Sequence, residues 1–178
     1  NGTFIVDNTT LGRLQDGFSS ITIGDTTAGA LSVGGINTLT DDLVLRAGTS
    51  SNLTVSGPLA WSSNNALTLA AGNDIWILDN IDVGGAAASL NLLFGGTDGT
   101  SAPTTGRNYN LDLANQRSIE FANTSASLKI GNVNYTLIDS RSGFTGMSSS
   151  GNFALARGLD LSGTTDNTAI YNGTFSGR

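Results

Sequence analysis

Short segments in which apolar and polar residues alternate recur along most of the chain. Each has the form apolar-x-apolar, as in Leu67-Thr68-Leu69 and Ile75-Trp76-Ile77. The predicted strands are 21–23, 31–33, 43–45, 53–55, 67–69, 75–77, 81–83, 90–92, 111–113, 119–121 and 128–130. This two-residue period is typical of strands with one buried face. No segment between residues 1 and 140 sustains a helical period, so the sequence predicts an all-β protein.

The spacing of alternate strands is regular. Strands that begin near residues 21, 43, 67, 90 and 111 follow one another at steps of about 21–24 residues. A unit of that length, with short strands and Gly, Asn or Asp turns, matches one coil of a parallel β-helix. Leu, Ile and Val then stack inside, while Thr, Ser and Asn form ladders outside. We therefore expect a β-solenoid of about six or seven coils.

A β-sandwich is the alternative fold. It needs antiparallel hairpins, which favour Asn-Gly or Asp-Gly turns between longer strands. Such dipeptides occur at 16–17, 98–99 and 172–173, but most of the predicted strands are joined by Ala-Gly, Gly-Gly or Gly-Asn. The pattern favours the β-helix, and the β-sandwich stays the alternative fold.

Two segments interrupt the strand pattern. Residues 97–107 contain Pro103 and no large apolar side chain, which predicts a protruding loop. Residues 139–152 are rich in Gly and Ser. We expect β-helix coils over residues 1–138, and a C-terminal module over residues 139–178 that continues beyond this chain.

Composition excludes several classes of partner. Charged residues make up only 12% of the 178 residues, and there are 24 glycines, which suits closely stacked strands. The net charge of −6, with the basic residues scattered, argues against nucleic acid and anionic membrane surfaces. No apolar run approaches the roughly 20 residues needed to cross a bilayer, so no membrane insertion is expected. The chain begins at Asn1 rather than Met, which indicates a processed form or an internal fragment.

Residues 64–85, NNALTLAAGNDIWILDNIDVGG, resemble the repeat of large exoproteins of the filamentous haemagglutinin type. In that repeat L-x-L-x-A-G-x-D-I is followed by a second strand and a Gly-rich turn. Residues 135–163, from YTLID to FALARGLDLSG, resemble a module that follows such repeats and precedes an F-x-G segment, here Phe175-Ser176-Gly177. The resemblance covers most of residues 20–178.

This resemblance implies a right-handed β-helical passenger that an outer-membrane transporter exports by the two-partner route. The protein would then be secreted or held at the bacterial cell surface. The resemblance implies adhesion to a host-cell or surface receptor, with a glycan among the candidates, or a spacer role in the adhesin shaft. It implies no catalytic residues and no cofactor.

Groups for catalysis are few. The chain has no His and no Cys, so Ser-His-Asp and Cys-His constellations are excluded within it. Lys129 and Glu120 are the only residues of their types, and Asp41-Asp42 is the only adjacent acidic pair. This pair falls at a predicted turn, where we expect solvated, turn-capping carboxylates rather than catalytic ones. A polysaccharide-active β-helix enzyme stays the alternative function, beside a shaft spacer without a ligand.

The two tryptophans are the candidate ligand contacts. Trp76 lies between Ile75 and Ile77, so it points away from the face that they fill. If the isoleucines are inside, Trp76 is exposed, where it can stack on a sugar or be covered by a loop. Trp61, close to Pro58, is the second candidate contact, although a cap on a turn is the expected role.

Three acidic residues, Asp74, Asp79 and Asp82, lie close together in the sequence and could offer oxygen ligands to Ca²⁺. The calcium-binding pattern G-G-x-G-x-D is absent. We therefore expect them to shape a turn between coils and predict no metal site.

Overall fold

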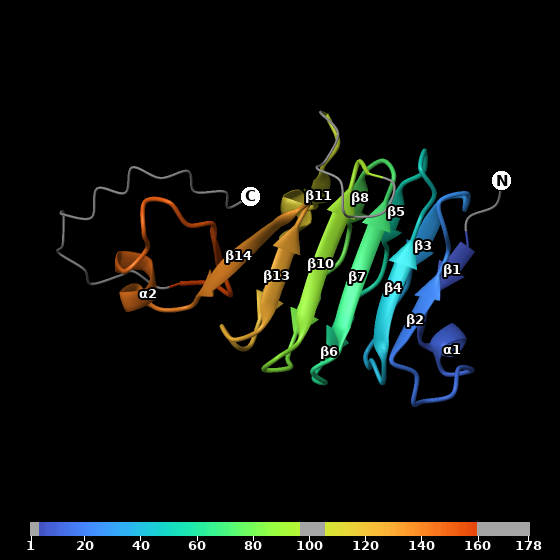
Figure 1. The fold of residues 1–178 in the computed structure, drawn as a ribbon, viewed down its shortest axis with the longest axis horizontal. Coiled ribbons are helices and arrows are strands. Elements are labelled where there is room, and N and C mark those ends of the chain that lie inside the picture. The colour runs from blue at the N-terminus through green and yellow to red at the C-terminus, as the bar shows by residue number, and fades with distance from the viewer. Residues whose placement is uncertain (1–3, 97–105, 160–178) are drawn as a thin grey trace.

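The computed structural model describes residues 4–96 and 106–159, and this part of the protein is mostly β-strand (Figure 1). A five-stranded sheet has the order β1 (Phe4–Val6), β3 (Leu31–Val33), β5 (Leu53–Val55), β8 (Ile75–Ile77), β11 (Tyr109–Leu111). A seven-stranded sheet has the order β15 (Phe153–Leu155), β14 (Val133–Ile138), β13 (Ser127–Ile130), β10 (Ser89–Phe94), β7 (Ala66–Ala71), β4 (Asp42–Arg46), β2 (Ser20–Ile23). A three-stranded sheet has the order β12 (Ile119–Phe121), β9 (Ile81–Val83), β6 (Leu59–Trp61).

Helices are few and short in the described residues. They are α1 (Asn8–Leu11), α2 (Arg141–Thr145) and a 3₁₀ helix, η1 (Leu113–Asn115). The predicted all-β class is therefore confirmed. None of these helices is long and apolar enough to cross a membrane.

The chain visits the three sheets in a fixed order. A strand of the seven-stranded sheet is followed by one of the five-stranded and then one of the three-stranded sheet, as in β4, β5, β6 and again in β7, β8, β9. We call one such passage a circuit. In the described residues every strand pair except β13–β14 is parallel. The antiparallel sandwich is therefore wrong, because from β1 to β13 neighbouring strands belong to successive circuits and not to hairpins.

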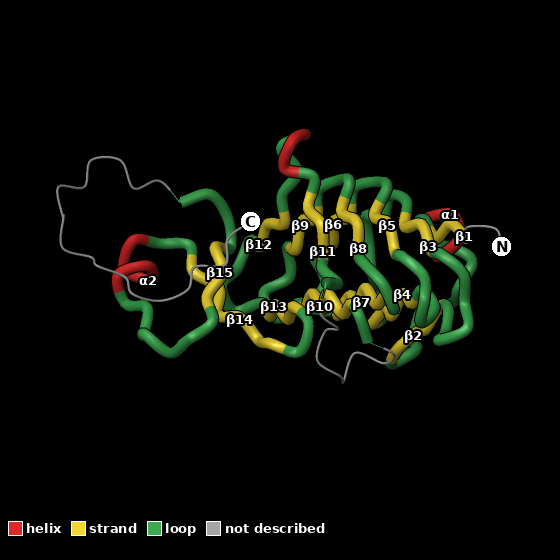
Figure 2. Tube along the Cα trace, turned by 90° about the horizontal axis from the view of Figure 1, so that it is seen from above, coloured by secondary structure: helices red, strands yellow, loops and turns green. Residues whose placement is uncertain are grey.

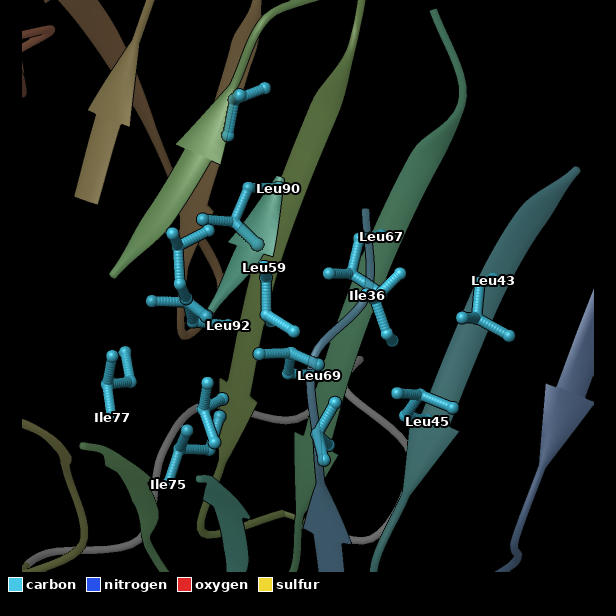
Figure 3. Packing of buried hydrophobic residues seen from close by; sticks show 14 of the residues in the cluster. Ile36, Leu43, Leu45, Leu59, Leu67, Leu69, Ile75, Ile77, Leu90 and Leu92 are labelled. Carbon is cyan, nitrogen blue, oxygen red and sulfur yellow. The ribbon is translucent and has the colours of Figure 1, made fainter. Parts of the chain in front are cut away.

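The parallel register places equivalent apolar side chains beside one another in successive circuits. On the seven-stranded sheet these positions are Leu43, Leu67 and Leu90 in one row and Leu45, Leu69 and Leu92 in the next. All six side chains are at most 3% exposed, and they face an interior that the other two sheets also line (Figures 2 and 3). Burying one such Leu contributes about 1.5–3 kcal/mol, so these rows form the core of the fold.

Glycine occupies the corner that follows the strands of the seven-stranded sheet. The residues at this corner are Gly24, Gly48, Gly72 and Gly95. The N–H of Gly72 donates to the carbonyl of Gly48 at 3.1 Å, so the corners stack directly. A Cβ at Gly72 would fall on the backbone of Thr49. Only glycine lets the turns approach this closely.

Asn and Asp side chains connect one circuit to the next. Asp42 Oδ1 accepts the N–H of Ala66 at 2.8 Å, and Asn64 Oδ1 accepts the N–H of Ala87 at 3.0 Å. Further bonds of this kind run from Asp74 N–H to Asn52 Oδ1, from Asn108 N–H to Asp74 Oδ1 and from Ser118 N–H to Asn80 Oδ1. These bonds satisfy backbone donors at the strand starts, where the sheet ladder has not yet begun. They explain why the turns are rich in Asn and Asp.

The predicted strand at 111–113 is wrong. β11 ends at Leu111, and Asp112 instead caps the 3₁₀ helix, with its carboxylate accepting the N–H of Asn115 at 3.3 Å. The next parallel strand of the seven-stranded sheet after β10 is β13, so the circuit that begins at β10 is longer than the regular step predicted. Each of the two larger sheets holds five strands of this parallel stack in the described residues.

Beyond β13 the parallel stacking stops. A two-residue turn, Gly131-Asn132, reverses the chain into β14, which runs antiparallel to β13, and β15 then pairs with β14. The Gly/Ser-rich segment 139–152 contains α2, whose first turn is capped by Ser140. Residues 97–105 of the predicted loop and 160–178 of the predicted C-terminal module lie outside the described residues.

Candidate functional site

Trp76 lies at the centre of β8 and points away from the core. Its neighbours Ile75 and Ile77 are both 0% exposed, whereas Trp76 is 42% exposed. The orientation predicted from the two-residue period is therefore confirmed. The equivalent outward positions of the neighbouring strands β5 and β11 hold polar residues. The sheet itself therefore does not require an exposed indole at this position.

The residues on either side of Trp76 are small or polar. Thr54 of β5 and Asn110 of β11 are its direct register partners, one strand spacing (about 4.8 Å) away on each side. Ser32 of β3 continues the row, and its hydroxyl is 2.9 Å from that of Ser56. We call this outer surface of the five-stranded sheet, formed by Ser32, Thr54, Trp76 and Asn110, the Trp76 face.

Charged groups lie just before the start of β8 and of β11. Asp74, two residues before Trp76, accepts the N–H of Asn108 at 2.8 Å. The Arg107 guanidinium lies 3.8 Å from the Asp74 carboxylate. Because this ion pair is partly exposed, it contributes little to stability, but it adds a donor and acceptor set beside the Trp76 face.

The Trp76 face combines two features that suit a sugar. An exposed indole offers an apolar plane on which the C–H groups of a pyranose ring can stack. The Thr54 hydroxyl and the Asn110 amide offer hydrogen bonds to the ring hydroxyls. The arrangement supports weak, reversible binding.

Trp61 is buried, which rules it out as the second candidate ligand contact and agrees with the role at a turn that was expected for it. It lies in β6 at the same inward position as Val83 of β9, and it is only 3% exposed. Its indole N–H donates to the carbonyl of Asn65 at 3.1 Å, which closes the turn after β6. The segment Leu59-Ala60-Trp61 follows the two-residue period, so Trp61 must share the buried side with Leu59.

Asp41 and Asp42 both act as caps. Asp41 Oδ1 accepts the N–H of Gly17 at 3.2 Å, and Asp42 binds the N–H of Ala66 in the next circuit. The expected turn-capping role is confirmed. The expectation that both are solvated is wrong for Asp41, which is only 7% exposed because the segment after α1 packs against it.

The three acidic residues weighed as calcium ligands do not converge. Asp74 contacts Asn108 and Arg107, whereas Asp79 forms an ion pair with Arg117 at 3.0 Å. Asp82 lies on the outer side of β9. Within residues 4–96 and 106–159, no group of three or more His, Cys, Asp or Glu side chains is arranged to hold a metal ion.

The sequence pattern did not indicate that two acidic residues, Asp82 and Glu120, are neighbours. Asp82 of β9 is the register partner of Glu120 of β12, on the outer side of the three-stranded sheet. Partial burial, and then the charge of Glu120, raise the pKa of Asp82 above its ordinary value. These residues are far apart in the sequence, so only the pairing of β9 with β12 could have indicated their contact.

Comparisons of the chain with protein-family models, with curated proteins and with solved structures find no match.

Proposed function

We propose that this chain is a segment of a right-handed parallel β-helix and belongs to a secreted bacterial exoprotein of the filamentous haemagglutinin type. Its role is structural and adhesive, supporting attachment to a cell or surface receptor. Three observations support this proposal: the repeated circuit through three sheets, the buried rows of Leu, Ile and Val, and the resemblance of residues 64–85 to the exoprotein repeat. Export through an outer-membrane transporter and a place at the cell surface belong to the same proposal.

The exposure of Trp76 carries the adhesive part of the proposal. A rod that serves only as a spacer needs buried rows and polar ladders, and it has no need of a tryptophan that is 42% exposed. Trp76 stands on an outer sheet face between Thr54 and Asn110, which suits the ring of a glycan. We therefore assign glycan contact to the Trp76 face.

A glycan array with the folded chain tests this assignment, with Trp76→Ala and Trp76→Phe as variants. Leu78→Ala is the matched control, because Leu78 is 43% exposed and follows Trp76 on the same side of the chain. Trp76→Ala should weaken binding of the glycans retained by the unsubstituted chain about tenfold, which corresponds to about 1.4 kcal/mol. Trp76→Phe should retain part of the affinity, and Leu78→Ala should leave it unchanged.

Two outcomes would contradict the assignment. If the chain binds no glycan, cell or matrix protein, the adhesive role fails and the ligand-free spacer becomes the better proposal. If Trp76→Ala and Leu78→Ala weaken binding equally, general apolar contact and not the indole plane is responsible. Circular dichroism of each variant establishes that the fold is intact before binding is compared.

A further inference from the structure

The Trp76 face forms one continuous row across the five-stranded sheet. Ser32, Thr54, Trp76 and Asn110 are consecutive register partners in β3, β5, β8 and β11, so no member is offset along its strand. Neighbouring strands lie about 4.8 Å apart, so the row spans about 14 Å from Ser32 to Asn110. Ile5 of β1 extends the row and is 57% exposed, but its side chain cannot form a hydrogen bond. The polar part of the row therefore runs from β3 to β11.

Hydrogen-bonding groups on both sides of Trp76 are available to a ligand. In the part of the chain that the structure describes, the Thr54 hydroxyl and the Asn110 amide form no hydrogen bond with another protein group, and both residues are partly exposed. On the outer side of the seven-stranded sheet, in contrast, the Asn91 amide donates to the Thr68 hydroxyl at 3.0 Å. The two groups beside the exposed indole can therefore bind a ligand without breaking a bond within the protein.

The direction of a bound ligand follows from what surrounds the indole. A ligand that runs along β8 would meet Asp74 on one side and Leu78 on the other. The Asp74 carboxylate already accepts a backbone N–H and forms an ion pair, and Leu78 offers no polar group. A ligand that runs across the strands meets the Thr54 hydroxyl and the Asn110 amide. Only this second direction combines stacking with hydrogen bonds on both sides.

We propose that the Trp76 face binds a linear, neutral oligosaccharide that lies across the strands. One pyranose ring stacks on Trp76, and the adjacent rings form hydrogen bonds with Thr54 and Asn110. A pyranose in an extended β-1,4-linked chain is about as long as one strand spacing, so the row accommodates about four successive rings. This inference rests on the glycan contact proposed above, and it adds the shape, length and charge of the ligand.

The charges beside the row favour a neutral sugar. None of the four side chains of the Trp76 face is ionisable. Asp74 and Arg107 largely neutralise one another as an ion pair. Asp112, two residues after Asn110, adds a negative charge, and the whole chain carries a net charge of −6. An oligosaccharide with carboxylate or sulfate groups would therefore be repelled.

A series of oligosaccharides tests the proposal by calorimetric titration into the folded chain. The ligands are β-1,4-linked oligomers of glucose and of N-acetylglucosamine, from the monosaccharide to the hexasaccharide. Their ring substituents are equatorial, so the C–H groups of the ring face are free to stack on an indole. We expect the affinity for at least one sugar to rise at least tenfold from the monosaccharide to the tetrasaccharide and to level off beyond it.

Two control ligands separate shape from charge. Oligomers of α-1,4-linked glucose have the same sugar in a curved chain, and oligomers of β-1,4-linked glucuronic acid have an extended chain with carboxylates. Each tetrasaccharide should bind at least tenfold more weakly than the neutral β-1,4-linked tetrasaccharide.

Variants of the chain locate the hydrogen bonds. Thr54→Val keeps the shape of the side chain but removes its hydroxyl, so the affinity for the tetrasaccharide should fall about fivefold, the effect of one hydrogen bond. The affinity for the monosaccharide should not change. Asn110→Ala should act in the same way on the other side of the indole. Thr22→Val is the matched control, because Thr22 points outward from β2 on the seven-stranded sheet and should not affect binding.

The results distinguish this inference from the glycan contact on which it rests. If the chain binds no glycan on an array, both fail. If glycans bind through Trp76 but chain length has no effect, or curved or acidic chains bind as well, only the linear neutral ligand is wrong. Equal effects of Thr54→Val and Thr22→Val would also contradict it. Should a variant lose its fold by circular dichroism, the oligosaccharide series on the unsubstituted chain decides the question.

Discussion

Leu69 of β7 lies directly beside Leu92 of β10, and both side chains are fully buried. Leu45 of β4 is the register partner of Leu69 on its other side. Each side chain in such a row is therefore covered by the circuits before and after it, as well as by the facing sheets. Loss of one member exposes its neighbours on both sides.

We therefore expect Leu69→Ala to lower the free energy of unfolding by about 2–5 kcal/mol, because it leaves a cavity between two circuits. Leu69→Asp should abolish cooperative folding, since it buries a carboxylate without a partner. Thr68→Ala is the control, because Thr68 points outward, where its hydroxyl accepts a hydrogen bond from the Asn91 amide of the next circuit; its cost should stay near 1 kcal/mol. Urea denaturation measures all three, and equal costs for Leu69→Ala and Thr68→Ala would show that the inward assignment is wrong.

The corner glycines provide a second test of the stacked circuits. Gly72→Ala places a Cβ on the backbone of Thr49 in the preceding circuit, so the corner must open. We expect a loss of at least 1–3 kcal/mol, the cost of overpacking. Gly158→Ala is the control, since a Cβ there meets no atom within 4 Å. If both variants melt at the same temperature, the corners are not in close contact in solution.

Much of the fold could be predicted because the local sequence determines which side chains of a strand are buried. The segment Ile75-Trp76-Ile77 determines by its two-residue period alone which side chains are buried, and this held for β8 as for its neighbours. Trp61 obeys the same rule, because the period of Leu59-Ala60-Trp61 places its indole on the buried side with Leu59.

The long-range contacts were not predictable in the same way. Leu59 pairs with Ile81, 22 residues later, which the regular step predicts. Ile81 then pairs with Ile119, 38 residues later, because the circuit that starts at β10 contains a long segment before β11. The position of Glu120 beside Asp82 depends on this lengthened step. The predicted loop at 97–107 falls within this step, and residues 97–105 of it lie outside the described part of the chain.

The Asp42 cap provides a third prediction. Asp42→Ala removes the acceptor for the N–H of Ala66, so we expect a loss of about 1 kcal/mol in the free energy of unfolding. Asp42→Asn keeps a side-chain oxygen at the same position and should recover most of that loss. Hydrogen exchange of the Ala66 amide should accelerate in Asp42→Ala only. Equal stability of Asp42→Ala and the unsubstituted chain would contradict the capping role.

The Asp82–Glu120 pair predicts a dependence of stability on pH. Partial burial and the neighbouring Glu120 raise the pKa of Asp82 in the folded state, so the folded protein holds this proton more tightly than the unfolded chain. The contribution of Asp82 to stability is therefore complete below its ordinary pKa of 3.8 and is lost as the pH rises through the higher folded value. At neutral pH the ionised group destabilises the fold.

Asp82→Asn should accordingly raise the free energy of unfolding at pH 7 by a few tenths of a kcal/mol, since the side chain is only slightly buried and solvent screens most of its charge. The advantage should disappear at about pH 3, where Asp82 is protonated in both states. Glu120→Gln removes only the repulsion, so it should give a smaller gain, and Asp82→Asn should gain less when Glu120→Gln is already present. Urea titrations at the two pH values measure these differences. An advantage of Asp82→Asn that is the same at both pH values would mean that the substitution acts through packing and not through charge.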